Sequence, residues 1–456
     1  MNFVILILSI YGAIALISIL LYIPKLIQFA HAFTKPPHYV ATERRKLALV
    51  IPARNESEVI GALFTSIATQ TYDNFDVNVI VKSADDPTIA LSKQLGYNVF
   101  VIPDQTCKGD ALDGYFHALG QDRLNDYDAY IIVDADAVLD DRFLEEMNNA
   151  LEQGRQVYVG RKFIKNNLSE DRCARSIFSS CAALAYPLND DWGNIYRMKK
   201  GTPLNFCGQG MMIRSDVIAE LGGWPYRTLT EDYEMKLDSF VKGYTSAYVP
   251  EAIVYTEEVI KHRDCWTRRL RWLMGYQQSD HKYKKAIRQK CKEGKLSFFA
   301  RYDCFFGIAP IILFIVASLL TALFGAGLTI YYACVGNKLW ISSLLLLTVL
   351  PIAVMYLIEF GFTCATLIVY REALEQLSVG EKIAIAFFNP LFTFEYFPIF
   401  IHAYFSLVFK KNLTWKPTKR IKMGHSLPVS LQKIKQYARS RRERKKSSCD
   451  EVRAEE

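Results

Sequence analysis

The sequence predicts an α/β domain, built on a sheet with helices on both faces, joined to α-helical transmembrane segments. Residues 46–262 alternate short runs rich in β-branched residues with amphipathic helical stretches, which is typical of strand–helix units. Apolar segments long enough to span a bilayer flank this region, at residues 1–33 and 303–409. A basic stretch that we expect to form interfacial helices (263–302) and a basic tail that we expect to be disordered (410–456) complete the organisation.

The first apolar segment predicts a membrane anchor. Phe3–Ile23 is uncharged and long enough to cross a hydrocarbon core as a helix. A cleaved signal peptide would need a positively charged start and a small-residue cleavage site, and both are missing. Lys and Arg residues follow between positions 25 and 46, so the positive-inside rule predicts a cytosolic location for the next domain.

Four strand–helix pairs are expected in residues 46–262. The strands are predicted at LALVI (47–51), VNVIV (77–81), NVFVI (98–102) and AYIIVD (129–134). A helical stretch follows each of them, and such alternation predicts a parallel sheet. Because parallel sheets bind ligands at the carboxyl ends of their strands, we expect the polar motifs at these ends to form the site.

Three further apolar segments are expected to enter the membrane: Cys304–Asn337, Leu339–Tyr370 and Ile383–Phe409. Acidic residues and prolines interrupt the last two, namely Glu359, Pro390, Glu395 and Pro398. A carboxylate inside a membrane segment is costly and usually faces a cavity, a partner or the interface. Three full spans after the anchor would place the basic tail outside, so we expect the last segment to be re-entrant or interfacial and the tail to be cytosolic.

The net charge of +8 is concentrated in the tail, where residues 410–456 hold 15 Lys and Arg against 5 Asp and Glu. Binding to nucleic acid would require a basic face on a folded domain. A basic stretch directly after an apolar segment instead fits anionic lipids, so we expect membrane lipids as partners and no nucleic acid. Ten scattered cysteines without a CxxC pair predict free thiols.

Two motifs near predicted strand ends suit a phosphorylated ligand. Asp134 and Asp136 end the run YIIVDAD, and two such carboxylates can hold one Mg²⁺ or Mn²⁺ that bridges a diphosphate. Lys108 opens a predicted helix, where the ammonium and the helix N-terminus favour a phosphate. A solvated lysine in a turn explains the second motif equally well.

Later clusters carry further polar chemistry. In Thr230-Glu231-Asp232 one carboxylate can act as a general base, and the same residues can also cap a helix. In Arg268-Arg269-Leu270-Arg271-Trp272 the guanidinium groups suit a diphosphate leaving group, with an interfacial helix as the alternative. The glycine-rich run from Asn205 to Gly210 predicts either a loop that approaches a ligand or a tight turn.

In this order the motifs resemble the membrane-integrated branch of family 2 glycosyltransferases, which includes cellulose, hyaluronan, chitin-oligosaccharide and poly-N-acetylglucosamine synthases. The resemblance covers residues 47–275 by motif and the flanking apolar segments by layout. It implies a GT-A fold, meaning a Rossmann-like mixed sheet with flanking helices. It also implies a nucleotide-sugar donor, Mg²⁺ or Mn²⁺, and an inverting single displacement at the cytosolic face of the cell membrane. The acceptor that it implies is a saccharide or a lipid.

The resemblance further implies a role for each motif. Asp232 corresponds to the catalytic base and Asp136 to the metal ligand. The donor is expected to contact Pro52, Ala53, Glu56, Asp85, Asp86, Lys108, Asp134, Arg269, Arg271 and Trp272. The acceptor is expected to contact Phe206, Cys207, Gly208, Gln209, Glu231 and Trp272. Trp415, after the last apolar segment, also resembles a family element.

Two departures from the family pattern affect the expected substrates. Lys82 stands where the family has an aspartate that reads uracil, with Asp85 or Asp86 as substitutes, which leaves the base open. Arg268 replaces the glutamine of the family's QxxRW motif, which weakens the prediction of processive synthesis. We expect transfer, from a UDP-sugar, to a membrane-associated acceptor or growing polysaccharide. The alternatives are single-sugar transfer to a lipid or isoprenoid carrier and, more distantly, a sugar nucleotidyltransferase or a transporter.

Overall fold

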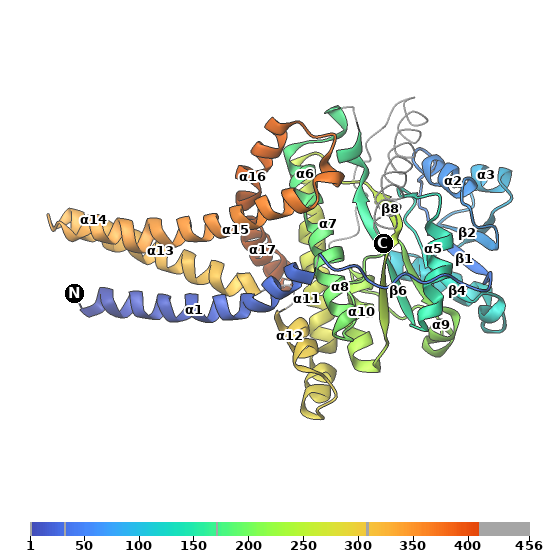
Figure 1. The fold of residues 1–456 in the computed structure, drawn as a ribbon, viewed down its shortest axis with the longest axis horizontal. Coiled ribbons are helices and arrows are strands. Elements are labelled where there is room, and N and C mark those ends of the chain that lie inside the picture. The colour runs from blue at the N-terminus through green and yellow to red at the C-terminus, as the bar shows by residue number, and fades with distance from the viewer. Residues whose placement is uncertain (1, 32, 170–171, 307–309, 410–456) are drawn as a thin grey trace, which may run out of the picture.

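The computed structural model describes residues 2–31, 33–169, 172–306 and 310–409, so the basic tail with Trp415 lies outside the described residues. A sheet domain adjoins a group of long helices that run away from it (Figure 1). The sheet has eight strands in the order β3-β2-β1-β4-β7-β6-β8-β5. The strands are β1 (Leu47–Pro52), β2 (Phe75–Val81), β3 (Asn98–Val101), β4 (Ala129–Ile132), β5 (Val138–Leu139), β6 (Val157–Ile164), β7 (Met211–Arg214) and β8 (Ser246–Thr256).

The two halves of the sheet differ in strand direction. In the first half β1 lies between β2 and β4, β3 pairs with β2, and all these pairs are parallel, as the strand–helix alternation predicts. In the second half β7 runs antiparallel between β4 and β6, and β5 is antiparallel to β8. The parallel sheet expected from the alternation is therefore mixed. Antiparallel pairing needs no helical crossover, so the alternation carries no signal for it.

The sheet buries a hydrophobic core on each face because successive side chains of a strand point to opposite sides. Leu47, Leu49 and Ile51 of β1 join the core beneath α2 and α5, whereas Ala48 and Val50 join the core beneath α4 and α9. These helices are α2 (Ile60–Ala68), α4 (Lys108–Leu119), α5 (Phe143–Ala150) and α9 (Ser215–Leu221). With both faces covered, the carboxyl ends of β1 and β4 are left to build a site.

Shorter helices complete the sheet domain. They are α3 (Thr88–Gln94), α6 (Ile177–Ala183), α7 (Ala185–Pro187), the π-helix η5 (Leu188–Asn194), α8 (Ile195–Lys199) and α10 (Glu231–Lys242). Short 3₁₀ turns are η1 (Gln121–Asp126), η2 (Leu151–Gln153), η3 (Lys165–Leu168), η4 (Arg172–Ala174) and η7 (Arg371–Leu374). The helices outside the sheet domain are α1 (Asn2–His31), α11 (His262–Lys292), α12 (Phe298–Phe306), α13 (Pro310–Cys334), α14 (Leu339–Ser343), the π-helix η6 (Leu344–Val349), α15 (Leu350–Val369), α16 (Val379–Phe394) and α17 (Tyr396–Val408).

Within the described residues, two helical segments are long and apolar enough to cross a membrane: Leu339–Val369 and Val379–Val408. The first joins α14, η6 and α15, and it lies with α1 and α13 in the group of helices that extends from the sheet domain (Figure 1). The second consists of α16 and α17, which meet at Glu395. The last expected apolar segment is therefore two helices.

Candidate active site

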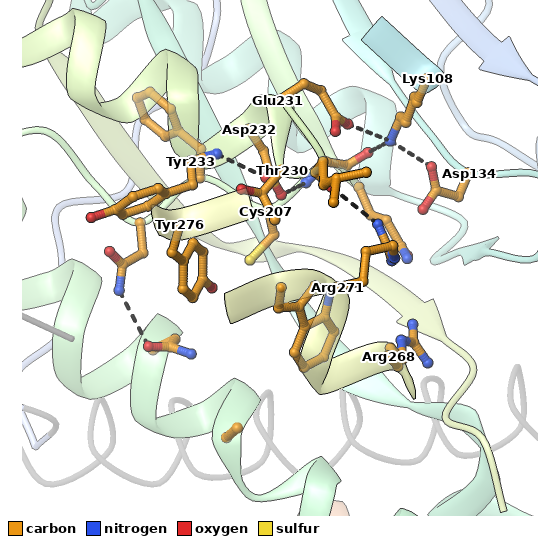
Figure 2. Close-up of a pocket in the computed structure, with 18 of the residues that line it drawn as sticks. Lys108, Asp134, Cys207, Thr230, Glu231, Asp232, Tyr233, Arg268, Arg271 and Tyr276 are labelled. Atoms are coloured by element: carbon orange, nitrogen blue, oxygen red, sulfur yellow. Dashed lines mark hydrogen bonds and ion pairs between the residues drawn. The ribbon is translucent and has the colours of Figure 1, made fainter. Parts of the chain in front are cut away.

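One large cavity, of about 620 Å³, begins at the carboxyl ends of β1 and β4 and continues to α15 and α17. Figure 2 shows a part of its lining at the end nearer the sheet. Fourteen of the predicted site residues line it: Pro52, Ala53, Glu56, Lys108, Asp134, Asp136, Phe206, Cys207, Gly208, Gln209, Glu231, Asp232, Arg271 and Trp272. The structure does not bring Asp85, Asp86 or Arg269 to this cavity.

Lys108 connects three elements at the wall of the cavity (Figure 2). It is the first residue of α4, whose start is fixed by a capping box. Its Nζ lies 2.6 Å from Asp134 Oδ1 and 3.6 Å from Glu231 Oε1, and it also donates a hydrogen bond to the carbonyl of Gly208. Burial disfavours the charged lysine, but the attraction of Asp134 and Glu231 outweighs it and raises the pKa of Lys108. The ammonium therefore stays charged.

Asp232 lies in the first turn of α10 and fixes the neighbouring loop. Its Oδ2 accepts a hydrogen bond from the backbone N–H of Gly208 at 2.8 Å, and its Oδ1 accepts one from Tyr233 N–H at 2.8 Å. A Cβ added at Gly208 would lie 2.7 Å from Lys108 Nζ and 3.1 Å from Glu231 Oε1. Glycine is therefore the residue that lets the loop approach all three charged groups.

Thr230 takes the N-cap position of α10, and Glu231 and Asp232 stand in its first turn, as the sequence predicts. The hydroxyl makes no capping hydrogen bond, and among the described residues Thr230 Oγ1 is buried without a hydrogen-bond partner. α11 approaches this oxygen closely, since a Cβ added at Gly275 would lie 2.4 Å from it. Glu234 instead accepts the backbone N–H groups of Arg227 and Thr228, at 2.9 and 2.8 Å.

Glu231 is a cavity residue whose carboxyl group has a raised pKa. Burial is the largest effect on it and raises its pKa, Lys108 lowers the pKa, and the negative charge of Asp232 raises it again. The result is a pKa of about 7. Its proton can therefore exchange under ordinary assay conditions.

Arg268 and Arg271 enter the cavity from α11 (Figure 2). Arg271 donates a hydrogen bond from Nη1 to the carbonyl of Leu229 at 3.2 Å. Burial and the neighbouring charge of Arg268 lower the pKa of Arg271. Arg268 lies 3.3 Å from Glu258 Oε2, and its guanidinium is 5.4 Å from the ring centroid of Trp272. Two half-buried guanidinium groups that repel each other favour an anionic ligand between them.

Arg269 points away from the cavity, which corrects the expectation that it contacts the donor. Its side chain is 2 % exposed and its guanidinium lies 3.9 Å from the ring centroid of Phe392. It donates to the carbonyl of Phe392 at 3.0 Å and pairs with Glu395 Oε2. Arg269 therefore joins α11 to the junction of α16 and α17.

Asp86 supports the loop that follows β1 and does not line the cavity. Asp85 does not line the cavity either. Asp86 is 5 % exposed and accepts the backbone N–H groups of Asn55 at 2.8 Å and Thr88 at 2.9 Å. Asn55 adopts φ of 56°, a conformation that asparagine tolerates better than most residues. We expected Asp85 and Asp86 to contact the nucleotide. Neither lines the cavity, and Asp86 instead holds the backbone of the loop at Asn55.

The loop between Asn205 and Gly210 combines a buried thiol with a buried amide oxygen. Burial raises the pKa of Cys207 to about 12, so this thiol stays protonated at neutral pH. Gln209 Oε1 is buried and has no hydrogen-bond partner among the described residues. The loop therefore offers polar atoms that a ligand can satisfy.

The sequence reasoning missed Tyr276, which lines the cavity, and a buried ion-pair group centred on Asp303. Tyr276 lines the cavity four residues after Trp272, so the helical period provided a signal for it. Lys236, one turn beyond Asp232, pairs with Asp303 of α12 at 2.8 Å, and Arg197 pairs with the same carboxylate at 2.8 Å. These partners lie far apart in the sequence, so no local pattern predicts the buried triad.

The cavity fits a divalent metal that is shared with a phosphate ligand. Among residues that the structure describes, no three His, Cys, Asp or Glu side chains form a metal-binding cluster. Asp134 and Asp136 both line the cavity, and Mg²⁺ commonly takes one or two carboxylates together with substrate phosphates and water. Since Lys108 already neutralises Asp134, Asp136 is the better candidate ligand.

Comparison with known proteins identifies the family to which the chain belongs. Residues 130–369, more than half of the chain, match the family model for "Glycosyl transferase family group 2". The chain belongs to this family, as its motifs predict.

Relatives and a solved structure agree with this assignment. The cellulose synthase catalytic subunit (UDP-forming) of Pseudomonas fluorescens is 24% identical over 343 residues, 69% of this chain and 43% of that protein. The beta-monoglucosyldiacylglycerol synthase of Trichormus variabilis is 24% identical over 250 residues, 53% of this chain and 52% of that protein. The chain thus spans about half the length of these relatives. The structure of the mannosyltransferase PcManGT from Pyrobaculum calidifontis, in complex with GDP-Man and Mn²⁺, superposes on this one with a TM-score of 0.51 at 16% identity. The superposition covers 84% of this chain and 98% of PcManGT. The GT-A fold is confirmed.

Proposed function

We propose that this enzyme transfers a sugar, with inversion and with a divalent metal, from a nucleotide-sugar donor to a membrane-associated acceptor. One observation carries the proposal: Asp136, Asp232 and Arg271 line the same cavity at the carboxyl edge of the sheet. A metal ligand, a base and a cation for the leaving group are the parts that a single displacement at an anomeric carbon requires.

On the donor side, Asp136 would hold Mg²⁺ or Mn²⁺, which neutralises the diphosphate when bound. Arg271 and Arg268 bind the same diphosphate as it departs, because guanidinium forks match phosphate oxygens and stay charged. Lys108 adds a cation at the N-terminus of α4, and Asp134 orients it at 2.6 Å.

On the acceptor side, Asp232 removes the proton from the attacking hydroxyl. Its hydrogen bonds to the backbone of Gly208 and Tyr233 hold the carboxylate in one orientation. The acceptor oxygen bonds to the anomeric carbon as the bond to the diphosphate oxygen breaks, and one such displacement inverts that carbon. Phe206, Cys207 and the other loop residues contact the acceptor.

The membrane location and the donor base belong to the same proposal. The basic residues that follow α1 and the two long apolar segments support an integral membrane protein whose sheet domain is cytosolic. The UDP-forming relative supports a UDP-sugar donor.

The test is transfer of labelled sugar from a panel of UDP- and GDP-sugars by the purified full chain in nanodiscs, with Mg²⁺ or Mn²⁺. We expect product with one donor, and its loss on EDTA treatment and in Asp136→Ala. Asp122→Ala, which removes an exposed carboxylate outside the cavity, is the matched control and should keep its activity. Undiminished transfer by Asp136→Ala would disprove the metal assignment, and no turnover of any donor by the folded wild type would disprove the function.

A further inference from the structure

Helix α10 holds the 205–210 loop, which lines the cavity, at two points. Near the middle of the loop, the backbone N–H of Gly208 donates a hydrogen bond to Asp232 Oδ2 at 2.8 Å. At its start, Asn205 Oδ1 accepts a hydrogen bond from Lys236 Nζ at 2.5 Å. Asp232 and Lys236 are four residues apart on α10, so both bonds leave the same face of this helix.

Lys236 is fixed by a buried carboxylate on a different helix. The lysine is 1 % exposed and is not among the described residues that line the cavity. Its Nζ lies 2.8 Å from Asp303 Oδ2 of α12. Arg197 donates to Asp303 Oδ1 from Nε at 3.0 Å and from Nη2 at 2.8 Å. These three residues, which we call the buried triad, therefore determine where the ammonium that binds Asn205 lies.

Hydrophobic packing makes α12 a firm support for the triad. Leu237 and Phe240 of α10 pack in one buried cluster with Ile287 of α11 and Ala300 of α12. Asp303 follows Ala300 by three residues, which is about one helical turn. The position of Asp303 relative to α10 is therefore set by the core beneath it.

The other contacts of Asn205 leave its orientation to Lys236. Its backbone N–H donates to Asn194 Oδ1 at 2.8 Å, and its carbonyl accepts from Asn194 Nδ2 at 3.2 Å. Both bonds come from one side chain, so Asn205 can pivot about it. Asn205 Nδ2 also donates to Asn189 at 3.2 Å, but this bond is exposed and water competes for it.

The charge balance of the triad speaks against a purely stabilising role. It contains two cations for one carboxylate, and Arg197 with Asp303 alone would already be a neutral, bidentate pair. Burying a second cation adds a desolvation cost that this pair does not require. A function for Lys236 at the 205–210 loop accounts for that cost.

We propose that Lys236 is a positioning residue, which holds Asn205 so that the 205–210 loop keeps the carboxylate of Asp232 aimed at the acceptor hydroxyl. The inference rests on the proposed function, and it adds a residue that touches neither substrate. It also gives α12 a part in catalysis, because Asp303 sets the place of Lys236.

The experiment compares full-length proteins in nanodiscs: wild type, Lys236→Met, Asn205→Ala and the double variant. Methionine has a volume similar to that of lysine, and the other two members of the triad remain a complete pair, so no buried charge is left unpaired. The control is Lys242→Met, which removes an exposed lysine at the end of the same helix, outside the cavity lining.

The first measurement is hydrogen–deuterium exchange of the peptides that cover the 205–210 loop and α10. In Lys236→Met we expect exchange in the loop to become about tenfold faster, with α10 unchanged. Transfer of labelled sugar from the donor that the panel identifies should show kcat lower by about tenfold or more, because the base is misaligned. The Kd of the nucleoside diphosphate with Mn²⁺ should change less than about twofold. The double variant should lose no more activity than Asn205→Ala, and Lys242→Met should match wild type.

Three results would overturn the positioning role and leave the proposed function standing. They are an unchanged kcat or loop exchange in Lys236→Met, equally faster exchange throughout α10, and additive losses of activity in the double variant. Equal acceleration throughout α10 would mean that Lys236 only stabilises the helix. Absence of any donor turnover in folded wild type would overturn the proposed function and this inference together.

Discussion

Two faces of one helix, α11, serve different parts of the molecule. Arg271, Trp272 and Tyr276 face the cavity, where the proposed chemistry takes place. Arg269, two residues before Arg271, is buried against Phe392 and joins α11 to α16 and α17. An α-helix has 3.6 residues per turn, so neighbours in a basic run face different surroundings. Arg268 and Arg271, three positions apart, both line the cavity, whereas Arg269 between them does not.

Replacing the proposed base, Asp232, should produce the largest loss of activity. Asp232→Asn keeps the shape of the side chain but cannot take a proton, so we expect turnover to fall about a thousandfold. Labelled-sugar transfer measures this, with Asp216→Asn on the exposed surface as the control. Turnover within tenfold of wild type in a folded Asp232→Asn protein would falsify the base assignment.

Arg271→Ala should produce the next largest loss. We expect kcat/KM to fall about a hundredfold, roughly 3 kcal/mol of transition-state stabilisation, because the leaving diphosphate loses a buried guanidinium. Arg271→Lys should recover part of the loss, since lysine keeps the charge and lacks the fork. If alanine and lysine behave alike and both stay near wild type, the cavity face of α11 does not bind the leaving group.

Arg269→Ala should instead affect stability. The variant loses the contacts with Phe392 and Glu395, and we expect a cost of about 2 kcal/mol in unfolding free energy. The cost is limited because Glu395 keeps His262 as a partner at 2.9 Å. A thermal scan should show a lower midpoint, while kcat/KM per folded enzyme changes less than about threefold. A large loss of activity without a change in the midpoint would contradict the structural role assigned to Arg269.

The smallest expected effect is a pH dependence from Glu231. Its pKa of about 7 lies above the usual range, so the carboxyl is protonated below that pH and ionised above it. Only the ionised form pairs with Lys108, so we expect kcat/KM to rise a few-fold as pH increases through about 7. In Glu231→Gln this inflection should disappear from the pH–rate profile. An unchanged inflection in that variant would assign the titration to another group.

Much of the sheet domain follows from local sequence. The four β-rich runs became β1 to β4. β1 and β4 are buried almost throughout, because both faces of the sheet are covered, and they therefore read as continuous apolar runs. β7 was not predicted, although α9 follows it directly, because a strand of four residues leaves only a short pattern in the sequence.

The site was predicted less evenly, for a physical reason. Asp134, Asp232 and Lys108 stand at element ends, where local sequence fixes the position of a side chain. Arg269 and Asp86 have the expected residue types but face other surroundings, which tertiary packing decides. Glu359 was recognised as costly, but only the fold revealed which cavity it lines.

The central claim is that α11 presents its arginines to a donor diphosphate on one face only. Titration calorimetry of UDP and GDP with Mn²⁺ against wild type, Arg271→Ala and Arg269→Ala tests it directly. The account predicts that Arg271→Ala weakens the Kd of the bound nucleotide at least about tenfold, whereas Arg269→Ala stays within about twofold. Equal weakening in both variants, or weakening in Arg269→Ala alone, would contradict it.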